Sequence, residues 1–163
     1  MQTKSRWMRD GISVGLMAYL AVAVFYSAFD VMASRGAFFT VNLLGRAVFR
    51  GLRDPAVLQF PVALDFPAAF WYNAVHLAMS LGIGLVVMGL VEQAEREPDQ
   101  AHMVSAIIVG GFIATIGGVG LVTEPIRALV PWWSVVTANV IATAGGAAYL
   151  TVKRPGIWRR MMA

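Results

Sequence analysis

One histidine of this sequence has the residue type and the position to do chemistry. His76 lies about ten residues inside a long apolar segment, at a depth of a bilayer where ionisable side chains are costly. Its imidazole has the chemistry of a haem ligand, a proton relay or a metal ligand. The structural alternative is a neutral imidazole hydrogen-bonded to polar groups of neighbouring helices, namely Asn139, Thr143, Tyr19 or Tyr26. We favour the structural role, because no second strong feature accompanies His76.

A haem b site is the cofactor alternative at His76. Bis-histidine ligation needs two imidazoles at one depth, but His102 begins a different apolar segment and is about 20 Å from His76 in depth, by helical rise. A haem would therefore need His76 from two protomers, or a methionine partner such as Met17. The sequence predicts no cofactor, and haem or quinone binding at His76 stays the alternative.

The sequence contains few residues that could support other kinds of reaction chemistry. The chain has no cysteine, which excludes disulfides, thiol nucleophiles and Cys-ligated metal clusters. No Ser–His–Asp set, HExxH motif or phosphate-binding loop occurs. Three carboxylates fall at one predicted end of the helices, where Arg35 and Arg127 are placed to neutralise them: Asp30, Asp65 and Glu124. We interpret these groups as ion pairs, so no catalytic residue or metal ligand is predicted, which favours a protein that is not an enzyme.

Four apolar segments must position these residues. Of 163 residues, 58% are hydrophobic and 13% are charged, whereas soluble proteins average roughly a quarter charged. A helical crossing of a bilayer needs about 20 mostly apolar residues. Four stretches reach or approach that length: 11–30, 66–91, 103–123 and 128–152. The predicted fold class is an all-α membrane protein, an antiparallel four-transmembrane-helix bundle that forms a single domain over 1–163.

The first connection contains a fifth predicted helix, over 38–53. At about 100° per residue, aliphatic side chains gather on one side and arginines on the other, with Leu43 as the exception. The two sides are Val41, Leu44, Val48 and Leu52, and Arg46, Arg50 and Arg53. This pattern is typical of an amphipathic helix that lies in the membrane interface with its arginines towards headgroups. A helix packed across the end of the bundle fits the pattern equally well.

Charge and aromatic residues predict the orientation. Eight Lys or Arg residues fall on one side of the arrangement: Lys4, Arg6, Arg9, Arg96, Lys153, Arg154, Arg159 and Arg160. Five fall on the other: Arg35, Arg46, Arg50, Arg53 and Arg127. Because cytoplasmic loops are enriched in Lys and Arg, both termini are expected in the cytoplasm and 30–65 outside a bacterial inner membrane. Tryptophans mark both boundaries: Trp7 and Trp158 inside, and Trp71, Trp132 and Trp133 outside.

Small and polar residues predict how the helices pack. Membrane helices associate through close backbone approach and interhelical hydrogen bonds. We expect four faces to meet in the interior: Tyr19 and Tyr26; Asn73, His76, Ser80 and Gly84; Ala106, Gly110, Ala114 and Gly118; and Asn139, Thr143 and Gly146. The +4 formal charge is spread over segment ends rather than gathered on one face, so no nucleic-acid partner is predicted.

A resemblance covers about the first two thirds of the chain. The run SAFDVMASRGAFFTVNLLGRAVFRGLRDP, residues 27–55, and the later YNAVHLAMSLGIGLVV resemble a type of small four-helix bacterial integral membrane protein that is uncharacterised. The resemblance implies a four-helix membrane fold, but no activity and no site residue.

The predicted function is non-catalytic. We expect an accessory, assembly or stabilising subunit of a larger membrane complex, whose partners are lipids and other membrane subunits or copies of itself. Two alternatives remain open. One is an electron-transfer subunit that binds haem or quinone at His76, and the other is an oligomeric conduit for ions or small molecules.

Overall fold

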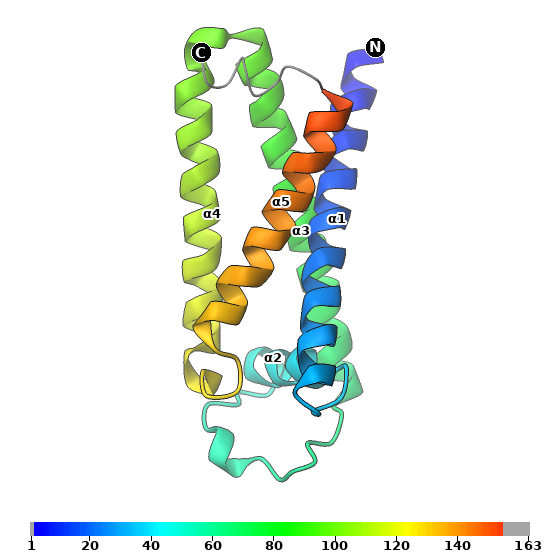
Figure 1. Cartoon of the computed structure of the whole chain (residues 1–163), viewed down its shortest axis with the longest axis vertical. Helices are drawn as coiled ribbons and strands as arrows, with labels where there is room; N and C mark the ends of the chain where they lie inside the picture. Colours follow the sequence, from blue (N-terminus) through cyan, green and yellow to red (C-terminus); the bar gives the residue numbers. More distant parts are fainter. Residues whose placement is uncertain (1, 155–163) are drawn as a thin grey trace.

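The structure, a computed structural model, describes residues 2–154, with side chains from residue 6 onward. Four long helices, α1 (Gln2–Met32), α3 (Phe66–Arg96), α4 (Ala101–Thr123) and α5 (Trp132–Lys153), carry the chain back and forth between two ends of the molecule (Figure 1). The short α2 (Phe39–Phe49) lies at one of these, which we call the α2 end. Each of the four long helices has the length and apolar composition to cross a membrane. No strand forms between residues 2 and 154.

The helices differ from the predicted segments mainly at their ends. Helix α1 begins at Gln2 and α3 continues to Arg96, beyond the apolar stretches that predict them. Charged residues end an apolar stretch without ending the backbone hydrogen bonds of a helix, so these helices run on. Helix α5 begins only at Trp132, because the extended Pro131 precedes it. Trp158, Arg159 and Arg160 lie outside the described residues.

Helices α1 and α3 pack with their backbones in close contact. A Cβ placed on Gly15 would lie 2.5 Å from the Ser80 carbonyl oxygen and 2.7 Å from Leu81 Cα. A Cβ on Gly84 would collide with the backbone of Gly11 and Gly15. Only glycine permits this approach of two backbones, which we call the α1–α3 seam. Ser80 is buried along the seam.

Helix α5 crosses α1 diagonally and buries a face of three small residues and one leucine (Figure 1). That face is Ala138, Ala142, Gly146 and Leu150, in steps of four residues. The prediction was wrong about Thr143, which is exposed, and Asn139 donates to the Val135 carbonyl of its own helix at 2.8 Å. The sequence pattern favoured polar side chains at the contact, whereas the structure uses alanines one position earlier, which allow a closer approach.

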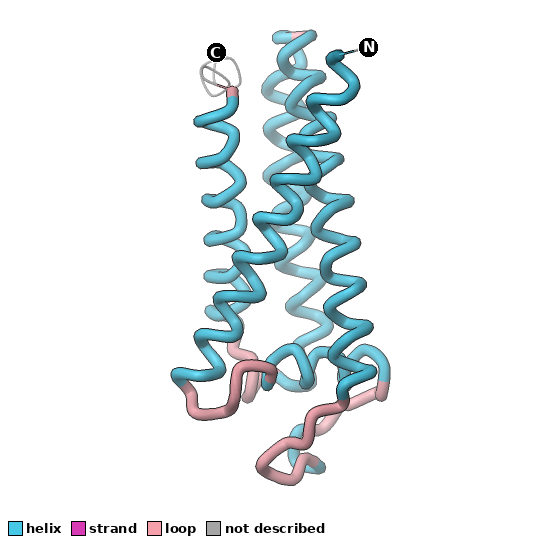
Figure 2. Tube along the Cα trace, turned by 90° about the vertical axis from the view of Figure 1, so that its right-hand side faces the viewer, coloured by secondary structure: helices cyan, strands magenta, loops and turns pink. Residues whose placement is uncertain are grey.

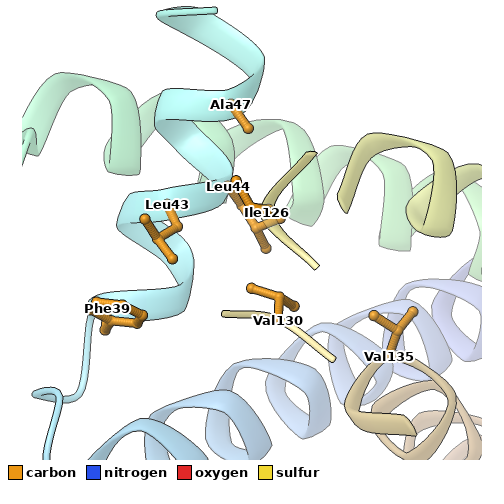
Figure 3. Packing of buried hydrophobic residues seen from close by; sticks show 7 residues of the cluster. All are labelled: Phe39, Leu43, Leu44, Ala47, Ile126, Val130 and Val135. Atoms are coloured by element: carbon orange, nitrogen blue, oxygen red, sulfur yellow. The ribbon is translucent and has the colours of Figure 1, made fainter. Parts of the chain in front are cut away.

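Helix α2 packs across one end of the long helices. Its buried face, Phe39, Leu43, Leu44 and Ala47, meets Ile126 and Val130 of the α4–α5 connection and Val135 of α5 (Figure 3). Leu43, the exception of the predicted amphipathic pattern, is fully buried, whereas Val48 is 47% exposed. The helix therefore takes the second position that the sequence allowed, packed across the bundle.

Local hydrogen bonds fix both ends of α2. The Asp30 carboxylate at the end of α1 accepts from the Thr40 backbone N–H at 2.6 Å and from its hydroxyl at 2.7 Å, which satisfies the first turn of α2. At the other end, Gly51 adopts a φ of +67°, and the Leu52 N–H donates to the Arg46 carbonyl at 3.2 Å. This left-handed glycine ends the helix before the predicted residue 53.

Helix α4 is held at its two ends. Ala101 and Val104 pack with Ala94 of α3 at one end, and the Trp132 ring covers Gly120 at the other. Between them α4 stands apart from α1 and α3 in Figure 1, and the loops gather at the two ends of the molecule in Figure 2.

The predicted inward stripe of α4 is therefore wrong for the single chain. Gly110, Ala114 and Gly118 are exposed, and a Cβ on either glycine would meet no described atom of another element within 4 Å. The physical reason is the rotation of the helix: its buried positions are Ala101, Val104, Gly120 and Thr123, so the stripe points outward.

Candidate functional site

His76 lies between two tyrosine rings. The Tyr19 ring of α1 is 5.3 Å from the imidazole, centroid to centroid, and the Tyr72 ring of α3 is 6.2 Å away. His76 forms no hydrogen bond within the part of the chain that the structure describes. The predicted bonds to Asn139, Thr143, Tyr19 or Tyr26 are therefore replaced by aromatic packing, because Tyr19 directs its hydroxyl to the Asn73 side-chain oxygen at 3.2 Å instead. Tyr26 has its hydroxyl 3.4 Å from the Ser134 hydroxyl.

Asn73 connects α1 and α3 beside this histidine. It accepts from Tyr19 and donates to the Ala69 carbonyl of its own helix at 3.1 Å. His76, Asn73 and Tyr19 thus form one interhelical cluster directly beyond the close contact of Gly15 with Ser80. Its groups pack and hydrogen-bond with one another, which suits a structural junction between the two helices.

Arginines and the α2–α3 connection lie at the α2 end. Arg50 donates from Nε and Nη2 to both oxygens of Asp65, at 2.9 and 3.3 Å. Arg46 donates from Nη2 to the Ala63 carbonyl at 2.7 Å, and Asn42 also donates to this carbonyl. These bonds fasten the end of the α2–α3 connection to α2. Arg53 is exposed and lies on the same side of the molecule.

The Arg50–Asp65 pair is stable at neutral pH. Hydrogen bonds from the Arg50 guanidinium, and then from the Ala68 N–H, hold the pKa of Asp65 below its ordinary value of 3.8. A depressed carboxyl pKa contributes stability that is present above the ordinary value and is lost as pH falls through the lowered one. Asp65 also begins α3, since its side chain accepts from Ala68 N at 3.1 Å.

The three outer tryptophans lie at the same end as these arginines. Trp71 is in the second turn of α3, and Trp132 and Trp133 begin α5; they are 58%, 38% and 57% exposed. Arg127 lies over the Trp132 ring, 5.6 Å from its centroid. Their role at a membrane interface stays a prediction.

A charged cluster that the sequence analysis missed joins three helices at the opposite end. Arg154 donates from Nη2 to Asp10 at 3.1 Å and from Nη1 to Glu95 at 2.6 Å. Tyr149 donates to the other oxygen of Asp10 at 3.3 Å. The available signal was position: Asp10 directly precedes Gly11 of the seam, and Arg154 follows Leu150 by one helical turn. We call this group the Arg154 clasp.

The other outer carboxylates have partners of their own. Asp30 is buried against Thr40, and Glu124 pairs with Arg127. Asp65 pairs with Arg50, so the three carboxylates do not converge. Within residues 2–154, no three His, Asp or Glu side chains lie together as metal ligands. The three carboxylates therefore form separate local contacts.

Comparison with protein-family models, curated proteins and solved structures found no match for this chain.

Proposed function

We propose that this protein crosses a membrane four times as an antiparallel bundle and serves as a non-catalytic accessory subunit of a larger membrane complex. In this proposal α4 is the helix that binds the partner. The expected location is a bacterial inner membrane with both termini and the α3–α4 connection in the cytoplasm. The α2 end would then face the outside.

The observation that carries this proposal is the outward stripe of α4. The chain uses the rest of its small-residue contacts internally, at Gly11, Gly15, Gly84 and Gly146. Helix α4 repeats the same spacing at Ala106, Gly110, Ala114 and Gly118, yet no described residue covers it. Small residues at intervals of four allow the close helix approach on which membrane helices depend. A transmembrane helix of another subunit fits this surface.

Purification in a mild detergent, with the mass of the native complex measured, tests the proposal. The wild-type chain should co-purify with a second membrane protein. Gly110→Leu and Gly118→Leu should release that protein while the chain itself stays folded. Gly82→Leu is the matched control, because Gly82 is an exposed glycine of α3 with equally open surroundings.

The same preparation separates the alternatives. A complex that contains only copies of this chain, and that Gly110→Leu dissociates, would make α4 a homo-oligomer contact. A native mass of the single chain for wild type would contradict the proposal. A visible haem absorption band would favour the electron-transfer role instead, and ion flux in liposomes would favour a conduit.

A further inference from the structure

An open hollow at the α2 end has more positive charge than its own carboxylates neutralise. It measures about 570 Å³ and lies between the end of α2 and the connection that follows. Arg46, Arg50 and Arg53 line it together with Asp54 and Asp65, which leaves one positive charge in excess. The Arg50–Asp65 pair neutralises two of these groups, so the excess comes from Arg46 and Arg53 against Asp54.

Two of the arginines have hydrogen-bond donors without an acceptor. Arg46 uses Nη2 on the Ala63 carbonyl, but its Nε is shut off from solvent and has no acceptor. Arg53 makes no hydrogen bond or ion pair with any residue in 2–154. Because the Arg46 Nε has no access to solvent, a ligand in the hollow would meet the Nη1 group of Arg46, which forms no hydrogen bond with any residue in 2–154. Asp54 pairs with neither of these arginines, and one of its oxygens accepts from the Ala56 N–H at 2.8 Å.

The backbone brings these arginines together. Helix α2 presents Arg46 and Arg50 one turn apart, and the left-handed Gly51 then reverses the chain, so that Arg53 lines the hollow beside them. The Leu52 N–H bond to the Arg46 carbonyl closes this turn at 3.2 Å. The site therefore exists before a ligand arrives.

We propose that this hollow binds one phosphate group that carries a single negative charge. Guanidinium groups bind phosphate oxygens through paired, charge-assisted hydrogen bonds, for which the Nη1 group of Arg46 and the guanidinium of Arg53 supply the free donors. One excess positive charge matches a phosphodiester better than a phosphomonoester, whose charge approaches two. A phospholipid headgroup and free inorganic phosphate share this chemistry.

The surroundings of the hollow favour the lipid as the source. Leu52, Val57 and Leu58 form its apolar part, and Val57 is 70% exposed. Phe60 and Leu64 on the same connection are also more than half exposed. Apolar side chains beside a phosphate site suit a ligand whose phosphate continues into glycerol and acyl chains. If the four helices cross a membrane as proposed, this end lies at the headgroup level.

Binding to the purified chain in uncharged detergent tests the site. Phosphatidylglycerol should bind and raise the melting temperature, whereas diacylglycerol, which lacks the phosphate, should do neither. Arg53→Gln should weaken phosphatidylglycerol binding roughly tenfold, the effect of losing one charged hydrogen-bonding group. The double variant Arg46→Gln, Arg53→Gln should abolish it. Arg127→Gln removes the same charge from the same end outside the hollow, so its binding should stay within twofold of wild type.

A second arm with inorganic phosphate identifies the source. Binding of phosphatidylglycerol alone assigns the site to lipid, and binding of inorganic phosphate alone, if lost in Arg53→Gln, assigns it to a soluble anion. Unchanged binding in the double variant, or equal losses in Arg53→Gln and Arg127→Gln, would overturn the proposal. No variant here touches α4, so a missing partner complex and a missing phosphate site are separate results.

Discussion

Glycines have opposite surroundings in two regions of this molecule. In the α1–α3 seam, Gly15 and Gly84 lie so close to the facing backbone that a single added carbon would collide with it. In the middle of α4, Gly110 and Gly118 lie in open surroundings. Both regions have small residues at intervals of about one helical turn, so the residue type alone does not decide whether a helix contact forms.

The difference lies in what accompanies the glycines. The seam continues into the Tyr19–Asn73 hydrogen bond on one side and the Arg154 clasp on the other, so α1 and α3 are joined along most of their length. Helix α4 has its buried residues only near its two ends. Close packing in the seam stabilises the single chain, whereas the small residues of α4 remain available for contact with another molecule.

The largest effect is expected from Gly15→Ala. Its new Cβ would lie 2.5 Å from a backbone oxygen of α3, and a backbone cannot rotate away as a side chain can. We expect a loss of about 3 kcal/mol in the free energy of unfolding, the upper part of the range for overpacking. Reversible unfolding in detergent measures it. Gly82→Ala, on the outer side of α3, should not destabilise, and equal losses at both positions would show that the seam is not this close.

The Arg154 clasp should contribute next. Arg154→Gln leaves Asp10 and Glu95 close together without their cation, and we expect a loss of about 2 kcal/mol, between the values for exposed and fully buried pairs. Adding Asp10→Asn to this variant should restore part of the loss by removing one carboxylate. Arg96→Gln is the control, because Arg96 is 67% exposed in its pair with Glu92 and should cost less than about 1 kcal/mol. An equal cost for Arg96→Gln would contradict a special role of the clasp.

His76 should contribute through its ring. Packing between aromatic rings contributes about 0.5 to 1.5 kcal/mol beyond burial, so His76→Phe should stay near wild type in thermal stability and His76→Gln should lose about 1 kcal/mol. The reverse order would favour a hydrogen-bonding imidazole. A visible absorption spectrum of the same proteins gives an independent check, because a haem band that vanishes in His76→Gln would make His76 a ligand.

The smallest effect is expected on α4, and it has the opposite sign. Gly118→Ala meets no described atom within 4 Å, so the higher helix propensity of alanine should stabilise the isolated chain by up to about 1 kcal/mol. Thermal unfolding of this variant beside Gly15→Ala compares the two regions directly. Destabilisation by Gly118→Ala in the isolated chain would show that α4 packs more closely than this structure has it.

The four long helices were predictable because a long apolar stretch is a strong local signal. The rotation of each helix was harder. On α3 the predicted face contains Ser80 and Gly84, both buried. On α5 the polar Asn139 and Thr143 suggested a face that differs by one residue from the observed Ala138 and Ala142. A shift of one residue turns the buried face of a helix by about 100°. The spacing of small residues does not specify the direction of that face so closely.

Long-range partners were the other limit of the sequence. Asp10 and Arg154 are far apart in the chain, and each looked like an ordinary charge at the end of an apolar stretch. Leu43 broke the simple amphipathic pattern because α2 is covered on more than one side: Gly45 contacts the Ala68 backbone, while Leu43 belongs to the cluster with Ile126 and Val130. A periodic pattern describes one face of a helix, so it fails where two faces are buried.

The packing of α2 has a consequence for the order in which the protein is made. Leu43 and its neighbours lie in the first third of the chain, but Ile126 and Val130 that cover them come about 80 residues later, which takes roughly 4 to 16 s at ordinary rates of translation. During this interval the apolar side of α2 has only the partners made earlier, among them Tyr26, Val62 and Tyr72, and lacks Ile126 and Val130. Completion of the α4–α5 connection is thus the step that closes the α2 end, and a chain terminated after α4 would leave the Leu43 cluster without Ile126 and Val130.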